Sequence, residues 1–151
     1  MNPIHESGFA SLMVLFMASI PGGVAALVAL ILSWKRPKSA VVAANLAVLL
    51  SSAVCALAAL ITIKLHTLVD YWIDTGGYGP VDQVRAQYGA EWHASARLTA
   101  WAGLVLTALP FAISALVHVL AGRREPTLEK PTSVLIFAAV TIFGCVLTAI
   151  F

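Results

Sequence analysis

Residues 65–97 read LHTLVDYWIDTGGYGPVDQVRAQYGAEWHASAR, and they form the one long polar passage in this sequence. On each side of the passage lie two apolar segments. Each is long enough to cross a lipid bilayer, since about 20 helical residues span the hydrocarbon core. This pattern predicts an all-α integral membrane protein: a four-helix bundle of two antiparallel transmembrane hairpins, joined by an extracytoplasmic loop.

The composition points to the same class of protein. Of the 151 residues, 60% are hydrophobic and 11% are charged, whereas soluble domains carry roughly 25% charged residues. The mean hydropathy is +0.93. The net charge of +2 comes without a basic block, so we expect the lipid bilayer, and no nucleic acid, among the partners.

The apolar runs predict a single transmembrane domain. We expect helices at about residues 9–34, 39–74, 94–121 and 131–151, with an extracytoplasmic loop at about 75–93. The first segment lacks a basic n-region and is too long for a signal peptide. The second helix should project beyond the bilayer until Gly76-Gly77 ends it. Residues 81–93 of the loop have the pattern of a short amphipathic helix at the interface.

Small and polar residues within the apolar runs indicate close helix packing. Ala18, Gly22 and Ala26 are four residues apart, which predicts a smooth stripe where another helix can approach. Isolated polar side chains such as Asn45 in the second segment are typical of hydrogen bonds within or between membrane helices. Pro110 predicts a kink in the third segment, because proline removes a backbone donor.

Basic residues predict the orientation in the membrane. The two short turns hold most of them: Lys35, Arg36, Lys38, Arg123, Arg124 and Lys130. Cytoplasmic loops carry an excess of Lys and Arg. We therefore expect the short turns in the cytoplasm and both termini outside it, with the chain in a bacterial inner membrane.

The aromatic residues of the polar passage are predicted to sit at headgroup depth. We interpret five residues as an anchor or interaction surface: Tyr71, Trp72, Tyr88, Trp92 and Arg97. Arg97 either snorkels to the interface as an anchor or pairs with Asp70, Asp74 or Glu91.

Histidines provide the candidate chemistry. His5, His66 and His93, with Glu91, fall on the outer side of the predicted bundle, and imidazoles with a carboxylate suit Zn²⁺ or Cu²⁺. A bis-histidine haem between His66 and His93 is an alternative.

A second candidate is a proton path. His118 lies inside an apolar run, where it could relay protons together with Arg97.

Cys55 and Cys145 are predicted to lie at similar depth, where they could touch. Such residues are small apolar packing groups, and a disulfide between them is the alternative.

The residues His5-Glu6-Ser7-Gly8-Phe9, leading into an apolar helix, resemble the start of MotA/TolQ/ExbB-type proton-channel proteins. The resemblance covers the N-terminal third, and the large cytoplasmic domain of that family has no counterpart in the short turns. It implies helices that oligomerise around a pore and use an ion gradient.

No nucleotide loop, nucleophile elbow or C-x-x-C motif occurs in the sequence. We therefore predict no enzyme and no cofactor. The first hypothesis is a small non-enzymatic membrane subunit that oligomerises or docks onto a larger membrane complex. The alternatives are a proton- or ion-channel subunit of a MotA/TolQ/ExbB-like assembly, and a metal- or haem-binding membrane protein.

Overall fold

The computed structural model describes residues 3–74, 81–126 and 132–150, with side chains placed at residues 8–67, 71, 89–126 and 132–150. Within these ranges the chain forms helices and no strand. The helices are α1 (Pro3–Leu32), α2 (Pro37–Asp74), α3 (Val81–Arg124) and α4 (Thr132–Ile150). The predicted all-α four-helix bundle is confirmed, and α2 continues to Asp74 as expected.

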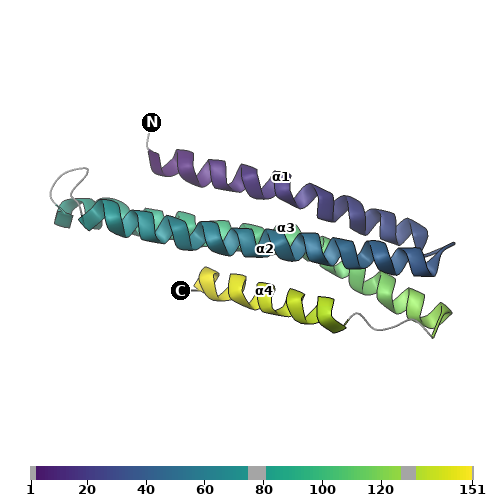
Figure 1. Cartoon of the computed structure of the whole chain (residues 1–151). Coiled ribbons are helices and arrows are strands. Elements are labelled where there is room, and N and C mark those ends of the chain that lie inside the picture. Colours follow the sequence, from purple (N-terminus) through teal and green to yellow (C-terminus); the bar gives the residue numbers. More distant parts are fainter. Residues whose placement is uncertain (1–2, 75–80, 127–131, 151) are drawn as a thin grey trace.

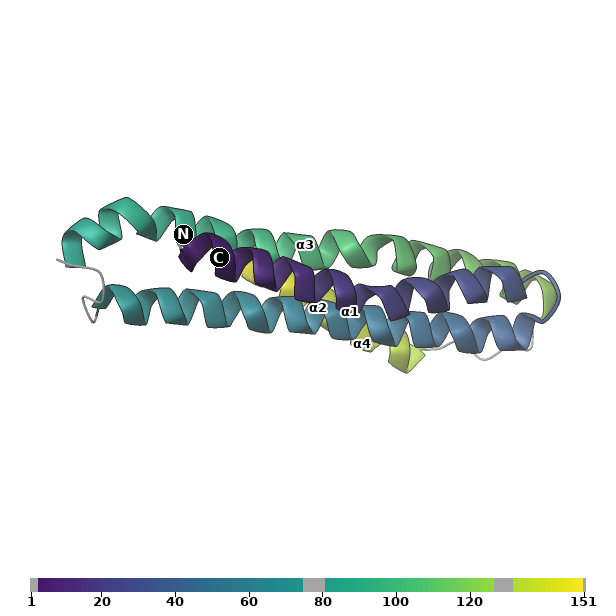
Figure 2. The ribbon, with the colours of Figure 1, turned by 90° about the horizontal axis from the view of Figure 1, so that it is seen from above.

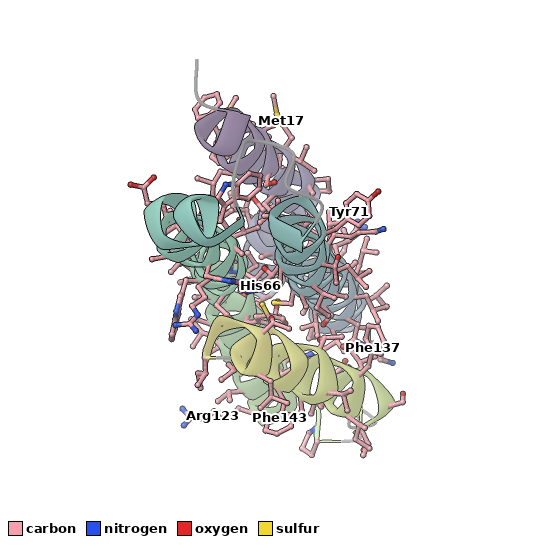
Figure 3. The ribbon with its side chains drawn as sticks, turned by 90° about the vertical axis from the view of Figure 1, so that its left-hand side faces the viewer. Met17, His66, Tyr71, Arg123, Phe137 and Phe143 are labelled. Atoms are coloured by element: carbon pink, nitrogen blue, oxygen red, sulfur yellow. The ribbon has the colours of Figure 1, made fainter. Side chains whose placement is uncertain are left out.

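Each helix contains a stretch long and apolar enough to cross a membrane. These stretches are Gly8–Leu32, Pro37–Thr67, Gly89–Arg124 and Thr132–Ile150. Large apolar side chains cover the outside of the bundle, and Met17, Phe137 and Phe143 point outward in Figure 3. A surface of this kind is stable in lipid and not in water, so the chain is an integral membrane protein.

The bundle is built around the pair α2 and α3, which contact each other more extensively than any other two described helices. α1 lies on one side of this pair and α4 on the opposite side (Figures 1 and 2). Viewed along its axis in Figure 3, the bundle has α1 and α4 at opposite corners of a diamond. Within the described residues, α1 and α4 do not contact each other.

Glycines allow the close approach of these helices. A Cβ atom added to Gly22 of α1 would lie 2.9 Å from Ser51 Oγ of α2, and one added to Gly103 of α3 would collide with the Ala58 side chain. Gly22 is the centre of the predicted stripe with Ala18 and Ala26, and Ala26 is fully buried. The stripe therefore packs within the chain, as small residues at membrane helix interfaces do.

One element differs from the sequence prediction. Residues 81–93, predicted as a short amphipathic helix within the loop, are helical, but they form the first turns of α3, so the predicted start of the third helix at about residue 94 is wrong. The segment VDQVRAQYGAEWH consists mostly of residues that tolerate or favour helix and contains no proline. Polarity alone therefore does not distinguish a loop from the start of a long helix.

Candidate site along the seam between α2 and α3

The contact line between α2 and α3, here called the seam, holds three contacts between polar side chains or between a polar side chain and the backbone: Cys55 with Thr107, Thr62 with Ala96, and His66 with His93. The two helices are antiparallel, with Cys55 opposite Thr107 and His66 opposite His93. Six buried hydroxyl residues lie on these two helices: Ser51, Ser52, Thr62, Thr99, Thr107 and Ser114. We call the end with His66 and His93 the histidine end and the opposite end, with Arg124, the arginine end.

In the middle of the seam, hydroxyl and thiol groups form hydrogen bonds with other groups of the bundle. Thr62 Oγ1 lies 2.8 Å from the Ala58 carbonyl oxygen of its own helix and 3.1 Å from that of Ala96 on α3. Its one hydroxyl hydrogen is therefore shared between two helices. This contact confirms the interpretation of such residues as interhelical hydrogen-bonding groups.

Two buried cysteines join α4 to the seam. Cys145 donates to the Ala100 carbonyl oxygen at 3.4 Å, and the Cys55 sulfur lies 3.2 Å from Thr107 Oγ1. The two thiols contact each other and both are free. The prediction that they could touch is confirmed, and they act as packing residues rather than as a disulfide.

A pair of imidazoles occupies the histidine end. His66 Nδ1 and His93 Nδ1 are 2.6 Å apart, and the ring centroids are separated by 4.8 Å. The distance between the two nitrogens, added to the distance from each nitrogen to the centre of its own ring, is about equal to the centroid separation. The two nitrogens therefore lie almost on the line between the ring centres, and the rings meet edge to edge. One Nδ1 carries the hydrogen and the other accepts it. Figure 3 shows His66 between α2 and α3.

Buried polar atoms of α2 and α3 also occur in the half of the bundle nearer the arginine end, and one of them, Ser51 Oγ, faces Gly22 of α1. From the Cys55–Thr107 level, Asn45 is about 15 Å away along α2 and His118 about 17 Å along α3, at 1.5 Å per residue. The two therefore lie at similar depth, with Ser51, Ser52 and Ser114 nearer the middle.

The polar atoms of this cluster are shielded from solvent. Seven buried side-chain atoms of the described residues have no hydrogen-bond partner, and five of them lie in this half of the bundle, away from both ends: Asn45 Oδ1, Ser51 Oγ, Ser52 Oγ, Ser114 Oγ and His118 Nε2. The three serines are at most 1% exposed. Pro110 lies at the same level and cannot donate to the Leu106 carbonyl. We call Asn45, Ser51, Ser52, Ser114 and His118 the inner polar cluster.

Sequence reasoning missed this cluster as a unit. It identified His118 as a relay candidate, treated Asn45 and the α2 serines as packing residues, and did not single out Ser114. The signal available was the lone amide and imidazole within apolar runs, but their shared depth depends on the register of α2 against α3.

At the arginine end, the Arg124 guanidinium group forms hydrogen bonds with the backbone that follows α1. Arg124 Nη1 donates to the carbonyl oxygens of Ser33 at 2.8 Å and Trp34 at 2.9 Å. These acceptors lie just after the end of α1, where helix carbonyls lack intrahelical donors. Arg124 thereby joins α3 to the end of α1.

The other predicted site residues are placed as follows. Glu91 is exposed, and it is two positions from His93, about 200° around α3. Arg97 and Tyr71 are exposed, and Trp92 is half-buried. The side chains of His5, Trp72 and Tyr88, and those of Asp70 and Asp74, lie outside the described residues. The structure thus brings together His66 and His93 of the predicted metal set, and places Arg97 on an exposed face of α3.

Comparison of the chain with protein-family models, with curated proteins and with solved structures finds no match. The class of protein follows from the fold alone: a small polytopic membrane protein with four apolar helices.

Proposed function

We propose that the protein is a non-enzymatic membrane subunit whose α2–α3 seam carries protons or a small cation along the bundle. The inner polar cluster is the observation that supports this proposal most directly. A buried polar atom without a partner costs about 1–3 kcal/mol, and a row of them is unfavourable in a helix bundle surrounded by lipid. Polar and ionisable residues inside a membrane are costly and mark ion and proton pathways.

The chemistry of the cluster suits proton transfer. Imidazole changes its charge between about pH 5 and 8 and has two nitrogens that can take up and release a proton. Serine hydroxyls and the Asn45 amide both donate and accept hydrogen bonds, so they can orient water molecules that link His118 to the middle of the seam. His66 and His93 offer a second pair of proton-exchanging groups at the other end. Arg97, exposed on α3, would influence the entrance through its charge.

Proton flux into liposomes tests the proposal. The purified chain is reconstituted with a pH-sensitive dye inside the vesicles, and a potassium gradient with valinomycin supplies the driving potential. We expect dye acidification that His118→Ala reduces to the rate of protein-free vesicles. Trp101→Ala, an exposed change on the same helix, is the matched control and should retain the flux.

The triple variant Ser51→Ala/Ser52→Ala/Ser114→Ala separates a pathway from simple packing. If the serines only fill space, their replacement removes a desolvation cost, so thermal stability rises and flux is unchanged. If they belong to a pathway, flux falls although the protein remains folded. Unchanged flux in this variant, or no flux from the unmodified chain, would rule out the pathway.

Assembly with another membrane chain is a second candidate function, favoured by the outward face of α3. Ala108, Ala112 and Ala115 are exposed there at helical spacing, beside bulky exposed side chains such as Leu109 and Leu116. A stripe of small residues lets a neighbouring helix approach closely. A second copy or a further membrane subunit could pack on this face.

The mass of the protein in mild detergent tests assembly. We expect an oligomer, or a co-purifying chain, that Ala112→Leu dissociates. Ala139→Leu introduces the same side chain at an exposed position of α4 and should leave the mass unchanged. A monomer without any co-purifying chain would contradict this function and leave the flux experiment unaffected.

A further inference from the structure

The histidine end presents two imidazoles in an arrangement that a metal ion can use. Nδ1 of His66, on α2, and Nδ1 of His93, on α3, are directed at each other at 2.6 Å. The planes of the two rings are inclined at 24° to each other, and the ring centroids are 4.8 Å apart. The two nitrogens therefore face each other from two different helices.

We propose that His66 and His93 bind one divalent transition-metal ion, Zn²⁺ or Cu²⁺, through their Nδ1 atoms. Imidazole nitrogens bind these ions at about 2.0–2.1 Å, so two nitrogens in adjacent coordination positions stand roughly 3 Å apart. From the present hydrogen-bonded pair, the separation must increase by a few tenths of an ångström, and both rings must turn so that their lone pairs converge on the ion instead of on each other. Side-chain torsions can supply both changes. The hydrogen on one Nδ1 transfers to Nε2 of the same ring, so both rings bind the metal as neutral imidazoles.

The same geometry discriminates between metal chemistries. A haem iron between two histidines needs nitrogens about 4 Å apart, on opposite faces of the porphyrin. The close pair instead favours a small ion bound in adjacent positions. Imidazole ligands select Cu²⁺ and Zn²⁺ over Mg²⁺ and Ca²⁺, which prefer oxygen ligands.

The location of the pair suits an ion that arrives from water. His66 lies at the end of the apolar span of α2, and His93 lies in the second turn of that of α3. Both are half-buried, while the adjacent Thr67 and Ala94 are exposed. Among the described residues, no third His, Cys, Asp or Glu completes a cluster with them. Water therefore supplies the remaining ligands, and the expected affinity is that of an exchangeable ion.

Positive charge near the site limits the affinity further. Arg97 is one turn beyond His93 on α3, and Lys64 is two residues before His66 on α2. Both side chains are exposed, so solvent screens their repulsion of a bound cation.

Calorimetric titration of ZnCl₂ into the purified full-length protein in mild detergent tests the proposal. We expect saturable binding of one Zn²⁺ per chain, and no binding of Mg²⁺. His66→Ala and His93→Ala should each weaken Zn²⁺ binding more than about ten-fold, because each removes one of two protein ligands. His118→Ala, at the other end of the seam, is the matched control and should bind Zn²⁺ unchanged. Zn²⁺ binding that both substitutions leave intact, or its absence from the unmodified chain, would overturn the assignment.

A spectroscopic measurement keeps the proposal testable if either variant fails to fold. The electron paramagnetic resonance spectrum of the Cu²⁺-loaded unmodified protein should show hyperfine coupling to two imidazole nitrogens. Coupling to one nitrogen or none would overturn the site. Because neither experiment measures flux, the metal site and the proton pathway can fail independently.

Discussion

At the scale of single residues, Gly103 determines how closely α3 approaches α2. A Cβ atom at this position would collide with Ala58, and the helix backbones can separate only by disrupting the Cys55–Thr107 contact beside them. We predict that Gly103→Leu destabilises the folded bundle by about 1–3 kcal/mol through overpacking. The fall in thermal midpoint in detergent measures the effect.

Gly144 of α4 provides the control for this prediction. Among the described residues, no atom outside its own helix lies within 4 Å of a Cβ added there, so Gly144→Leu should leave the midpoint unchanged. Equal effects of the two substitutions would show that helix propensity, rather than the contact with Ala58, determines the result.

The sequence alone predicts what a polar residue can do, such as form a hydrogen bond or bind a metal. It predicts less well which residues on other helices that side chain contacts. Isolated polar side chains within the apolar runs were correctly predicted to form hydrogen bonds between helices, and Thr62 forms one with α3. His66 and His93 were predicted to share a metal or haem site on the outer side of the membrane, but their direct contact was not predicted. Their contact depends on the register of α2 against α3, which glycine and alanine at one crossing fix and which no periodic pattern in either helix encodes.

At the scale of elements, Arg124 joins the last turn of α3 to the end of α1. We predict that Arg124→Ala lowers the free energy of unfolding by about 1 kcal/mol, because two carbonyl groups lose a charged donor at an exposed position. Chemical unfolding in detergent measures this change. Arg123→Ala removes an equal charge from an exposed neighbour and should have little effect; a similar loss in both variants would assign it to net charge.

The helical extension of α3 gives a second prediction at this scale. Because residues 81–93 belong to the helix, their backbone N–H groups from about residue 85 onward are hydrogen-bonded. Hydrogen exchange followed by mass spectrometry should show protection across 85–93. Exchange across 85–93 as fast as in an unstructured peptide would show that these residues form a loop and not the start of α3.

Element prediction from sequence succeeded where the physical requirement was strict. In lipid, backbone groups must be bonded within a helix, so the apolar runs predicted four helices and the approximate position of the apolar stretch in each. Outside the hydrocarbon that requirement no longer applies. Polarity then says little about conformation, and the start of α3 was placed about four turns too late.

At the scale of the whole molecule, the basic turns predict the orientation in the membrane. In a variant with Cys55 and Cys145 replaced by alanine, single cysteines at Ala90 and Gly122 report on opposite ends, since both positions are exposed. We predict that a membrane-impermeant maleimide added to intact cells labels the cysteine at 90 and not that at 122. Lysed cells, where both should react, are the control, and the reverse pattern would invert the topology.

The separation of α1 from α4 by the central pair has a consequence for how the chain is made. Since α4 touches only α2 and α3, residues 3–126 can form all their mutual contacts before the last helix leaves the ribosome. α4 then packs against α2 and α3 without separating any contact that α1 makes. Synthesis of this protein can thus proceed as a three-helix unit that acquires its fourth member last.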